Sequence, residues 1–310
     1  MGIYSKAVFH LSLVTAGVLL LAAGTHSEEK TISPEMIIDM KIPTGISISP
    51  NGSRVAYSLS MHRSEDEEPG IKHSEIWIVD TTSKQARRYT TRPGRSWSPS
   101  WSPDGSFIAF LTSRCEEDEK AEIIVMPVDG GEGERITDEE SPVISYRWFP
   151  DGNRIAFVVK DTLTDIEKEA NEKGRDWVVV DSTFLHRRLW SIDRVTKGKR
   201  LLCSDDVTVF DYEISPDGER IALTAAETPR TDDSYMFKKL MVLDVDRGKL
   251  SLIYDPKAKI GRPMWSPDGK FICYNAGVDM SDPSTGSLFV ISSKGGKPQN
   301  LTPNFPGTVT

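Results

Sequence analysis

The sequence has 310 residues and a formal net charge of −8, and its 38% hydrophobic and 27% charged content is that of a soluble globular protein able to bury a substantial core. Binding to nucleic acid or to anionic lipid requires a basic surface, so the acidic balance argues against both as partners. Length alone permits one or two domains.

The chain begins with the pattern of an exported protein. Lys6 is followed by a largely apolar run over residues 7–23, which ends in small residues at 22–24. A basic start, an apolar centre and a small-residue exit predict a secretory signal peptide over residues 1–24, and therefore a secreted or periplasmic protein. Because the apolar run approaches membrane-spanning length, an uncleaved membrane anchor is the alternative.

Residues 25–45 form an N-terminal segment in which Ser33 and Pro34 precede the apolar residues 36–38. Serine is a favoured N-cap and proline a favoured first helical residue, so a short helix is predicted here. The segment leads directly into the repeats described next and leaves no room for a separate N-terminal domain.

A ten-residue pattern then recurs five times between residues 46 and 276. Its fullest copy, Trp101 to Phe110, is W-S-P-D-G-S-F-I-A-F, and every copy has Trp or Ile two residues before its proline. A β-branched residue, a small residue and a large apolar residue stand five to seven residues after that proline. The prolines of the five copies are Pro50, Pro103, Pro150, Pro216 and Pro267.

The Ser-Pro-Asp-Gly centre of the repeat is typical of a tight turn. Proline pre-sets the backbone angle of the second turn position, Asp tolerates the third, and Gly is free to take a positive φ at the fourth. In the strand that follows, Ile or Val before Ala or Cys places a branched side chain on one face and a small one on the other, where a neighbouring sheet approaches closely. Paired strands joined by the turn are therefore predicted near residues 46–60, 97–112, 145–160, 211–226 and 262–276.

Each hairpin is followed by a third apolar strand and a short fourth one. Four antiparallel strands per unit, with successive prolines 47 to 66 residues apart, is the period of a β-propeller blade. We therefore predict an all-β protein with propeller blades over residues 46–302, of which five are legible, and the start of a further blade over residues 303–310. An ordinary β-sandwich whose turns resemble one another by chance is the alternative.

The longest insertion, residues 161–187, lies between the second and third strands of the third blade. Thr164 and Glu167 fit a capping box and Gly174 stands where a helix would end, so residues 165–173 are predicted to be helical. An insertion on one face of a propeller is a place where substrates or partner domains bind. A solvent-exposed insertion without a binding role is the alternative.

No metal site or cofactor is predicted. The acidic runs at residues 65–68 and 116–119 fall in expected hairpin loops, and neither has the ligand spacing of a calcium loop. Cys273 replaces the alanine of the repeat and is expected to be a buried small hydrophobe. Three cysteines define no disulfide framework, and a bridge between Cys115 and Cys203 is left open.

The chain resembles the non-catalytic propeller of the prolyl oligopeptidase family of serine peptidases, in particular its acylaminoacyl-peptidase and dipeptidyl-peptidase branch. The resemblance rests on the repeats, on the short helix that runs straight into them, and on the insertion with its D-W-V-V-V-D at residues 176–181. It covers residues 31–302. The repeat itself is shared with TolB-like propellers, so it is more specific for the fold than for the family.

This resemblance implies a C-terminal α/β-hydrolase domain that holds a Ser-Asp-His triad. Such a domain carries a G-x-S-x-G nucleophile elbow, which occurs nowhere in these 310 residues. His62, His73 and His186 lie in or beside expected blade loops, so no catalytic residue is predicted here. The chain is expected to be the N-terminal portion of a longer peptidase, whose family members tend to have seven blades.

Some members of the family hold a substrate's free amine with paired glutamates from the propeller. Glutamate pairs occur here at residues 67–68, 116–117 and 139–140. None stands in a motif that matches that role, so the substrate-binding residues stay unassigned.

The resemblance favours a steric function, in which a central channel admits short, flexible peptides to the catalytic chamber of the parent peptidase and excludes folded proteins. The expected partners are therefore peptides and the absent hydrolase domain. The alternative is a stand-alone TolB-like protein-interaction module, although the domain that precedes the repeats in TolB-like proteins has no counterpart here. An unrelated ligand-binding propeller, such as a sugar binder, is the remaining hypothesis.

A chain with five of seven expected blades leaves the outer faces of its first and last blades without partners. Ile48 and Tyr57 are expected on one such face, and Trp265 and Tyr274 on the other. Exposed apolar surface of this kind predicts self-association.

Overall fold

The computed structural model describes residues 32–64, 66–90, 94–113, 120–175, 184–203, 206–256, 258–281 and 286–309. The chain divides into two compact units, Met1–Lys41 and Ile42–Thr310. The second unit contains all of the described strands and therefore all of the repeats.

The described part of the first unit contains one short helix, α2 (Pro34–Ile38). The Ser33 hydroxyl accepts a hydrogen bond from the Met36 amide at 3.3 Å, which is the predicted N-cap contact. The predicted signal peptide, residues 1–24, lies outside the described residues. Among the helices that the structure describes, none is long and apolar enough to cross a membrane.

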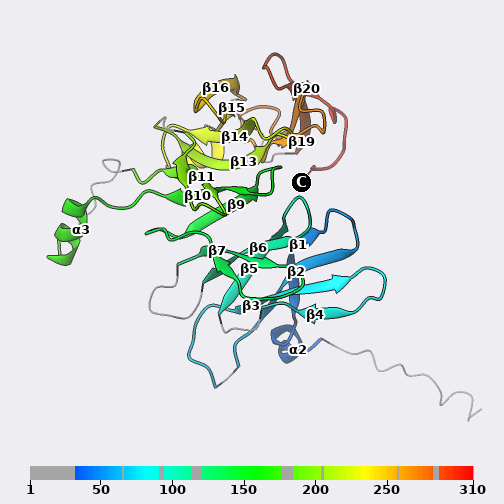
Figure 1. The fold of residues 1–310 in the computed structure, drawn as a ribbon. Coiled ribbons are helices and arrows are strands. Elements are labelled where there is room, and N and C mark those ends of the chain that lie inside the picture. Colours follow the sequence, from blue (N-terminus) through cyan, green and yellow to red (C-terminus); the bar gives the residue numbers. More distant parts are fainter. Residues whose placement is uncertain are drawn as a thin grey trace, which may run out of the picture. The chain divides into compact units, whose positions relative to one another are not determined.

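Within the described residues, twenty strands form five groups of four, which we call blades 1 to 5 (Figure 1). In chain order they are β1 (Ile42–Ile48), β2 (Arg54–Met61), β3 (His73–Asp80) and β4 (Ala86–Arg88); β5 (Arg95–Trp101), β6 (Phe107–Ser113), β7 (Glu122–Pro127) and β8 (Glu134–Arg135); β9 (Val143–Trp148), β10 (Arg154–Lys160), β11 (Arg187–Asp193) and β12 (Lys199–Leu201); β13 (Thr208–Ile214), β14 (Arg220–Ala226), β15 (Lys239–Asp244) and β16 (Lys249–Tyr254); and β17 (Met264–Trp265), β18 (Phe271–Ala276), β19 (Ser287–Ser292) and β20 (Gln299–Asn300).

Each blade is an antiparallel meander whose strands pair in chain order. Blades 1 and 2 are also joined by a single parallel bridge between Ser74 of β3 and Arg95 of β5, so that they form one continuous sheet. The predicted all-β class and the four-stranded antiparallel units are thereby confirmed. All five predicted hairpins are present, although β17 is only two residues long.

The five repeated turns share one hydrogen-bonded geometry. In each, the glycine amide donates to the carbonyl of the residue three positions earlier at 2.8–3.0 Å, and the glycine φ lies between 67° and 74°. The Ser102 hydroxyl donates to Asp104 Oδ1 at 2.5 Å, and the same oxygen accepts the Ser106 amide at 3.0 Å. Because a positive φ disfavours other residues, the turn requires glycine at its fourth position, as predicted.

The turn of blade 3 departs from the pattern because Phe149 replaces the serine. Asp151 Oδ1 there accepts the Arg154 amide directly at 2.9 Å, a contact that the serine hydroxyl makes in the other copies. The Phe149 ring is fully buried, and the Arg154 guanidinium carbon lies over it, 4.4 Å from the ring centroid. The same turn is thus held by a carboxylate and an aromatic ring instead of by a hydroxyl.

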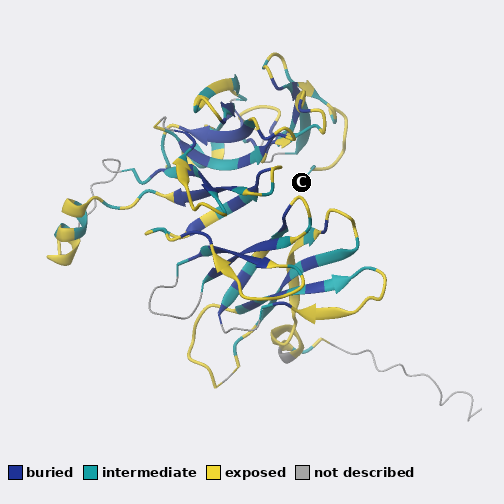
Figure 2. Cartoon of the chain, in the orientation of Figure 1, coloured by how far each residue is buried: buried dark blue, intermediate teal, exposed yellow. Residues whose placement is uncertain are grey.

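The hydrophobic core lies between consecutive blades, at interfaces that we call seams. Each of the four buried clusters draws its side chains from two neighbouring blades. Figure 2 shows the same distribution, with buried residues concentrated on the central strands and exposed residues on the turns. The fold is therefore stabilised by sheet-to-sheet packing from one blade to the next.

The branched and small residues of the repeat face opposite seams. Ile108 packs in the seam between blades 1 and 2, whereas Ala109 packs in the seam between blades 2 and 3. Ile221 and Ala222 of blade 4 repeat this division two seams further on. The predicted alternation is confirmed, with the small residue facing the following blade.

Two expectations for blade 5 were wrong for the same reason. Cys273 is half-buried instead of buried, because it holds the position that faces away from blade 4. Trp265 and Tyr274 do not lie on the outer face of blade 5; they pack in the seam with blade 4, where Tyr274 stacks on Phe289. On blade 1, Ile48 is 65% exposed, as expected.

Two helices lie between second and third strands. α3 (Asp165–Glu172) begins with the predicted capping box, in which Thr164 and Glu167 exchange hydrogen bonds. α4 (Thr231–Met236) in blade 4 was not predicted, since its N-cap residue, Arg230, makes no side-chain capping bond.

Candidate functional site

Three of the four seams are bridged by the tryptophan of the repeat. Wherever tryptophan stands two residues before the proline of blades 2 to 5, its indole N–H donates to a backbone carbonyl of the preceding blade. The acceptor is always the residue three positions before the preceding proline. The bonds are Trp101 to Ser47 at 3.0 Å, Trp148 to Ser100 at 3.3 Å and Trp265 to Glu213 at 2.9 Å.

The repeated turns also stack on one another. A Cβ atom placed on Gly105 would lie 3.5 Å from Pro50 Cδ, and one on Gly218 would lie 3.3 Å from Pro150 Cδ. A Cβ atom placed on Gly152 would lie 3.8 Å from Pro103 Cδ, and one on Gly269 would lie 4.0 Å from Pro216 Cδ. The glycine therefore serves two purposes, because it allows the turn conformation and admits the proline of the preceding turn.

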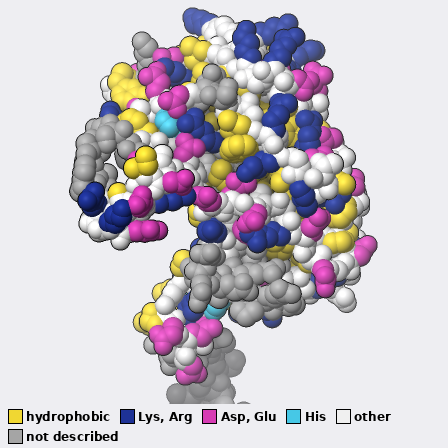
Figure 3. All heavy atoms as spheres, turned by 60° about the vertical axis from the view of Figure 1, so that its left-hand side comes forward, with side chains coloured by type: hydrophobic (Ala, Val, Ile, Leu, Met, Phe, Trp, Pro, Cys, Tyr) yellow, Lys and Arg dark blue, Asp and Glu magenta, His cyan; other side chains and the backbone are white. Residues whose placement is uncertain are grey.

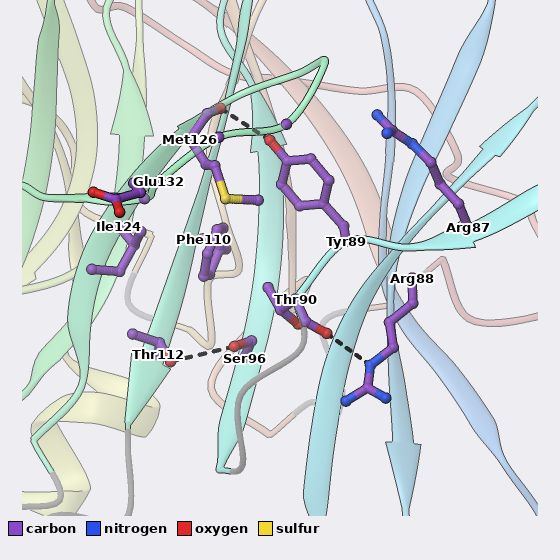
Figure 4. Close-up of a pocket in the computed structure, with 13 residues that line it drawn as sticks. Arg87, Arg88, Tyr89, Thr90, Ser96, Phe110, Thr112, Ile124, Met126 and Glu132 are labelled. Atoms are coloured by element: carbon purple, nitrogen blue, oxygen red, sulfur yellow. Dashed lines mark hydrogen bonds between the residues drawn. The ribbon is translucent and has the colours of Figure 1, made fainter.

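A cavity of about 510 Å³ lies between β4 of blade 1 and the facing surface of blade 2 (Figure 4). Its floor is polar, with the Ser96 and Thr112 hydroxyls 3.3 Å apart and both side chains buried. The Tyr89 hydroxyl closes one side by donating to the Pro127 carbonyl at 2.6 Å. The remaining wall consists of Phe110, Ile124, Met126 and the glycine-rich turn at residues 130–133.

The charges around this cavity suit binding more than catalysis. Burial raises the pKa of the Tyr89 hydroxyl well above its usual range, so that it stays neutral. The Arg88 guanidinium is held by Glu75 at 2.6 Å, and Arg87 donates to the Val128 carbonyl at 2.6 Å. Among the described residues that line the cavity, no histidine stands beside a hydroxyl to activate it. The cavity can therefore accept a small polar ligand, but it has no nucleophile and base in contact.

A second pocket, of about 300 Å³, lies between the turns of blades 2 to 4 and the first strand of blade 5. Arg147 of β9, Glu213 of β13 and Trp265 of β17 line it. Arg147 Nε lies 3.8 Å from Glu213 Oε2, and Arg262 pairs with the same carboxylate. The guanidinium groups of Arg147 and Arg262 thus pair with the same carboxylate, that of Glu213.

Two of the three described histidines, His73 and His186, contact neighbouring side chains. His73 Nε2 lies 3.0 Å from Glu67 Oε1, and His62 is exposed. His186 is buried, with its Nδ1 2.8 Å from the Thr208 hydroxyl and its Nε2 3.4 Å from Asp206. These positions in and beside blade loops are the predicted ones.

The glutamate pairs hold structural contacts. Glu67 caps a loop by accepting the Ser64 amide, which together with His73 lowers the pKa of its carboxyl. Glu139 and Glu140 pair separately, with Lys199 at 2.9 Å and with Lys168 at 2.7 Å. The pair at residues 116–117 lies outside the described residues, as does Cys115, while Cys203 is buried.

The described surface offers no cluster of metal ligands, and most of the face in view carries mixed charge. Among the residues searched, no group of three or more metal-ligating side chains comes together. Figure 3 shows acidic and basic side chains interspersed on this face. The seams and their pockets, which sequence reasoning did not assign, are therefore the features with binding potential. The repeated tryptophan was the available signal, but its partner is visible only in three dimensions.

The four-stranded sheets, their turns and their seams are those of β-propeller blades. Residues 41–192 match the family model described as TolB beta propeller domain (PD40). Curated homologues include peptidases, and the predicted resemblance to the prolyl oligopeptidase family is confirmed.

Two curated relatives extend over most of the chain. An uncharacterized peptidase YuxL of Bacillus subtilis (strain 168) is 28% identical over 258 residues, which is 82% of this chain and 32% of the relative. Dipeptidyl-peptidase 5 of Porphyromonas endodontalis is 24% identical over 276 residues, which is 80% of this chain and 39% of the relative. The chain thus spans about a third of the length of the curated relatives that it matches.

A solved structure extends the comparison to the fold. The acylaminoacyl peptidase of Pyrococcus horikoshii superposes with a TM-score of 0.59 at 14% identity, over 87% of this chain and 40% of that one. At this identity the likeness concerns the fold alone.

Proposed function

We propose that the chain is the non-catalytic, substrate-gating propeller portion of a secreted or periplasmic serine peptidase of the prolyl oligopeptidase family. The observation that carries the proposal is the extent of the peptidase similarity, which runs over 80% and 82% of this chain but over only 39% and 32% of the relatives. The region of those peptidases outside the match is long enough for a separate catalytic domain.

The gating function is steric. In a propeller the first strand of each blade lines a central channel, whose width is fixed by the packing of the seams. Seams held by indole–carbonyl bonds and by stacked turns keep that width constant, so a short peptide passes while a folded domain does not. The described seams supply this rigidity through Trp101, Trp148 and Trp265.

The chemistry of hydrolysis is assigned to the parent protein and not to this chain. His73 and His186 contact loop carboxylates and a threonine, and no G-x-S-x-G segment occurs in the sequence. Export is proposed from the basic and apolar order of residues 6–24.

The proposal is tested by reading the gene beyond Thr310 and by labelling its complete product with a fluorophosphonate serine probe. We expect a downstream G-x-S-x-G whose serine is labelled, and no labelling of residues 25–310 expressed as a matched control. Labelling of residues 25–310 above the level of denatured protein, or a complete product without a reactive serine, would contradict the proposal.

Gating itself needs a second measurement on the complete product. The rate of cleavage should fall steeply when the scissile bond is moved from a short peptide into a folded domain. A loosened seam, as in Trp148→Ala, should reduce that discrimination. Equal discrimination in both proteins would argue against a steric gate.

A stand-alone interaction module is the second candidate, because the family model that matches residues 41–192 is the TolB propeller. It predicts that the gene product ends near the propeller and that the chain captures a protein partner without hydrolysing it. A stop codon soon after Thr310 would favour it.

A further inference from the structure

The repeat breaks its own pattern at Ile214, in the seam between blades 3 and 4. In the other three seams the corresponding residue is a tryptophan that donates to the preceding blade. The carbonyl that an indole at position 214 would meet belongs to Arg147, three residues before Pro150. Ile214 has no donor to offer it.

The acceptor is nevertheless placed as in the other seams. Arg147 lies opposite Ala156 in the β9–β10 ladder, just as Ser100 lies opposite Ala109 and Glu213 opposite Ala222. The same register turns the same backbone edge toward the following blade, so the Arg147 carbonyl faces the position that an indole fills elsewhere.

The missing ring volume coincides with the pocket of about 300 Å³, which is lined by Ile214 and Arg147 and by the indoles of Trp148 and Trp265. Both indoles are fixed by their own hydrogen bonds, to Ser100 and to Glu213, and so cannot move in to fill the space. Met264, which also lines the pocket, is 59% exposed, so the space is reachable from solvent.

The rim of the pocket carries surplus positive charge. Arg147 and Arg262 share the single carboxylate of Glu213. Arg147 Nε is buried and has no hydrogen-bond partner among the described residues. A carboxylate at this rim would balance the second guanidinium.

We propose that this pocket, which we call the Ile214 pocket, binds an aromatic side chain that carries a hydrogen-bond donor, tryptophan or tyrosine, from a peptide with a carboxylate beside that residue. The ring occupies the place of the missing indole and donates to the Arg147 carbonyl, while the carboxylate meets Arg147 and Arg262. As a statement about substrates it rests on the proposed function, since it names the peptides that the gate would favour.

The test is calorimetric titration of the full chain with N-acetyl-L-tryptophan. Two matched probes each lack one group: N-acetyl-L-leucine lacks the donor ring, and N-acetyl-L-tryptophanamide lacks the carboxylate. We expect each to bind at least about tenfold more weakly, which corresponds to the loss of one favourable contact. Equal affinity for the tryptophan and leucine compounds, or no binding of N-acetyl-L-tryptophan, would overturn the proposal.

Ile214→Trp restores the repeat and should abolish binding, because the new indole fills the pocket and takes the Arg147 carbonyl. Ile214→Val keeps the pocket open and should bind as the parent does. If Ile214→Trp does not fold, Arg262→Gln serves instead and should weaken N-acetyl-L-tryptophan toward the amide probe. Undiminished binding in the folded Ile214→Trp protein, or in Arg262→Gln, refutes the site.

These outcomes separate the pocket from the peptidase proposal. Binding of N-acetyl-L-tryptophan that Ile214→Trp abolishes, together with no reactive serine in the complete gene product, would establish the pocket and remove the proposed function. A reactive serine in the complete gene product without binding of N-acetyl-L-tryptophan would support the proposed function and remove the pocket.

Discussion

The stacking of the turns makes a quantitative prediction for Gly218→Ala. A non-glycine residue in the left-handed region costs about 1–2 kcal/mol, and Gly218 has a φ of 74°. Its new Cβ would also lie 3.3 Å from Pro150 Cδ and 3.9 Å from the ring of Phe149, which is fully buried. Overpacking of this kind costs about a further 1–3 kcal/mol, so we expect a total loss of about 2–5 kcal/mol of unfolding free energy.

Gly52→Ala is the matched control, because Gly52 has the same turn and a φ of 71° but no atom within 4 Å of the added Cβ. It should lose only the conformational part, about 1–2 kcal/mol. Urea unfolding followed by circular dichroism gives both losses from the shift in midpoint at constant slope. If the two variants lose the same free energy to within about 0.5 kcal/mol, turn stacking does not stabilise the seams.

Further predictions concern the other seam and turn contacts. Trp148→Phe should cost about 1 kcal/mol in urea unfolding, since it removes the 3.3 Å bond to Ser100 but keeps the ring buried; no loss would mean that the bond is replaced by water. Phe149→Ser restores the repeat sequence, yet it should destabilise by about 3 kcal/mol or more, because the fully buried ring leaves a cavity; a gain in thermal midpoint would contradict this. The serine hydroxyls and turn amides lower the pKa of the carboxyls of Asp104, Asp217 and Asp268. The stabilisation that these carboxylates give is therefore present above the ordinary pKa of 3.8 and is lost as pH falls through the lowered values. The urea midpoint should drop on acidification below 3.8, and it should drop less when all three residues are replaced by Asn. Ile46→Ser with Ile48→Ser should reduce self-association in sedimentation, because these side chains are 68% and 65% exposed on β1; unchanged sedimentation would point to another surface.

The strands could be predicted because the repeat encodes them locally. Ser-Pro-Asp-Gly determines its own turn through hydrogen bonds within five residues, as Ser102 and Asp104 show. The alternation of Ile108 and Ala109 follows from the two faces of one strand. Neither needs information from the rest of the chain.

The faces of blade 5 and the pockets could not be predicted in this way. Tyr274 was expected on an outer face, because the pattern gives the alternation of faces but not which of them meets the preceding blade. The Ile214 pocket depends on a carbonyl of another blade, and no local pattern reveals such an acceptor. α4 was missed because its first turn, with Asp232 and Asp233, follows an N-cap without a capping side chain.

The indole bonds run in one direction along the chain, and this bears on how the protein is made. The donor always belongs to the later blade and the acceptor carbonyl to the earlier one, as for Trp101 and Ser47. During synthesis the earlier blade can close its meander first, since its strands pair in chain order and its contacts are local. The folded earlier blade then offers its acceptor carbonyl to the tryptophan that is synthesised next. We therefore expect assembly to proceed blade by blade from the N-terminus, so that a substitution in an early acceptor strand delays the blades that follow it.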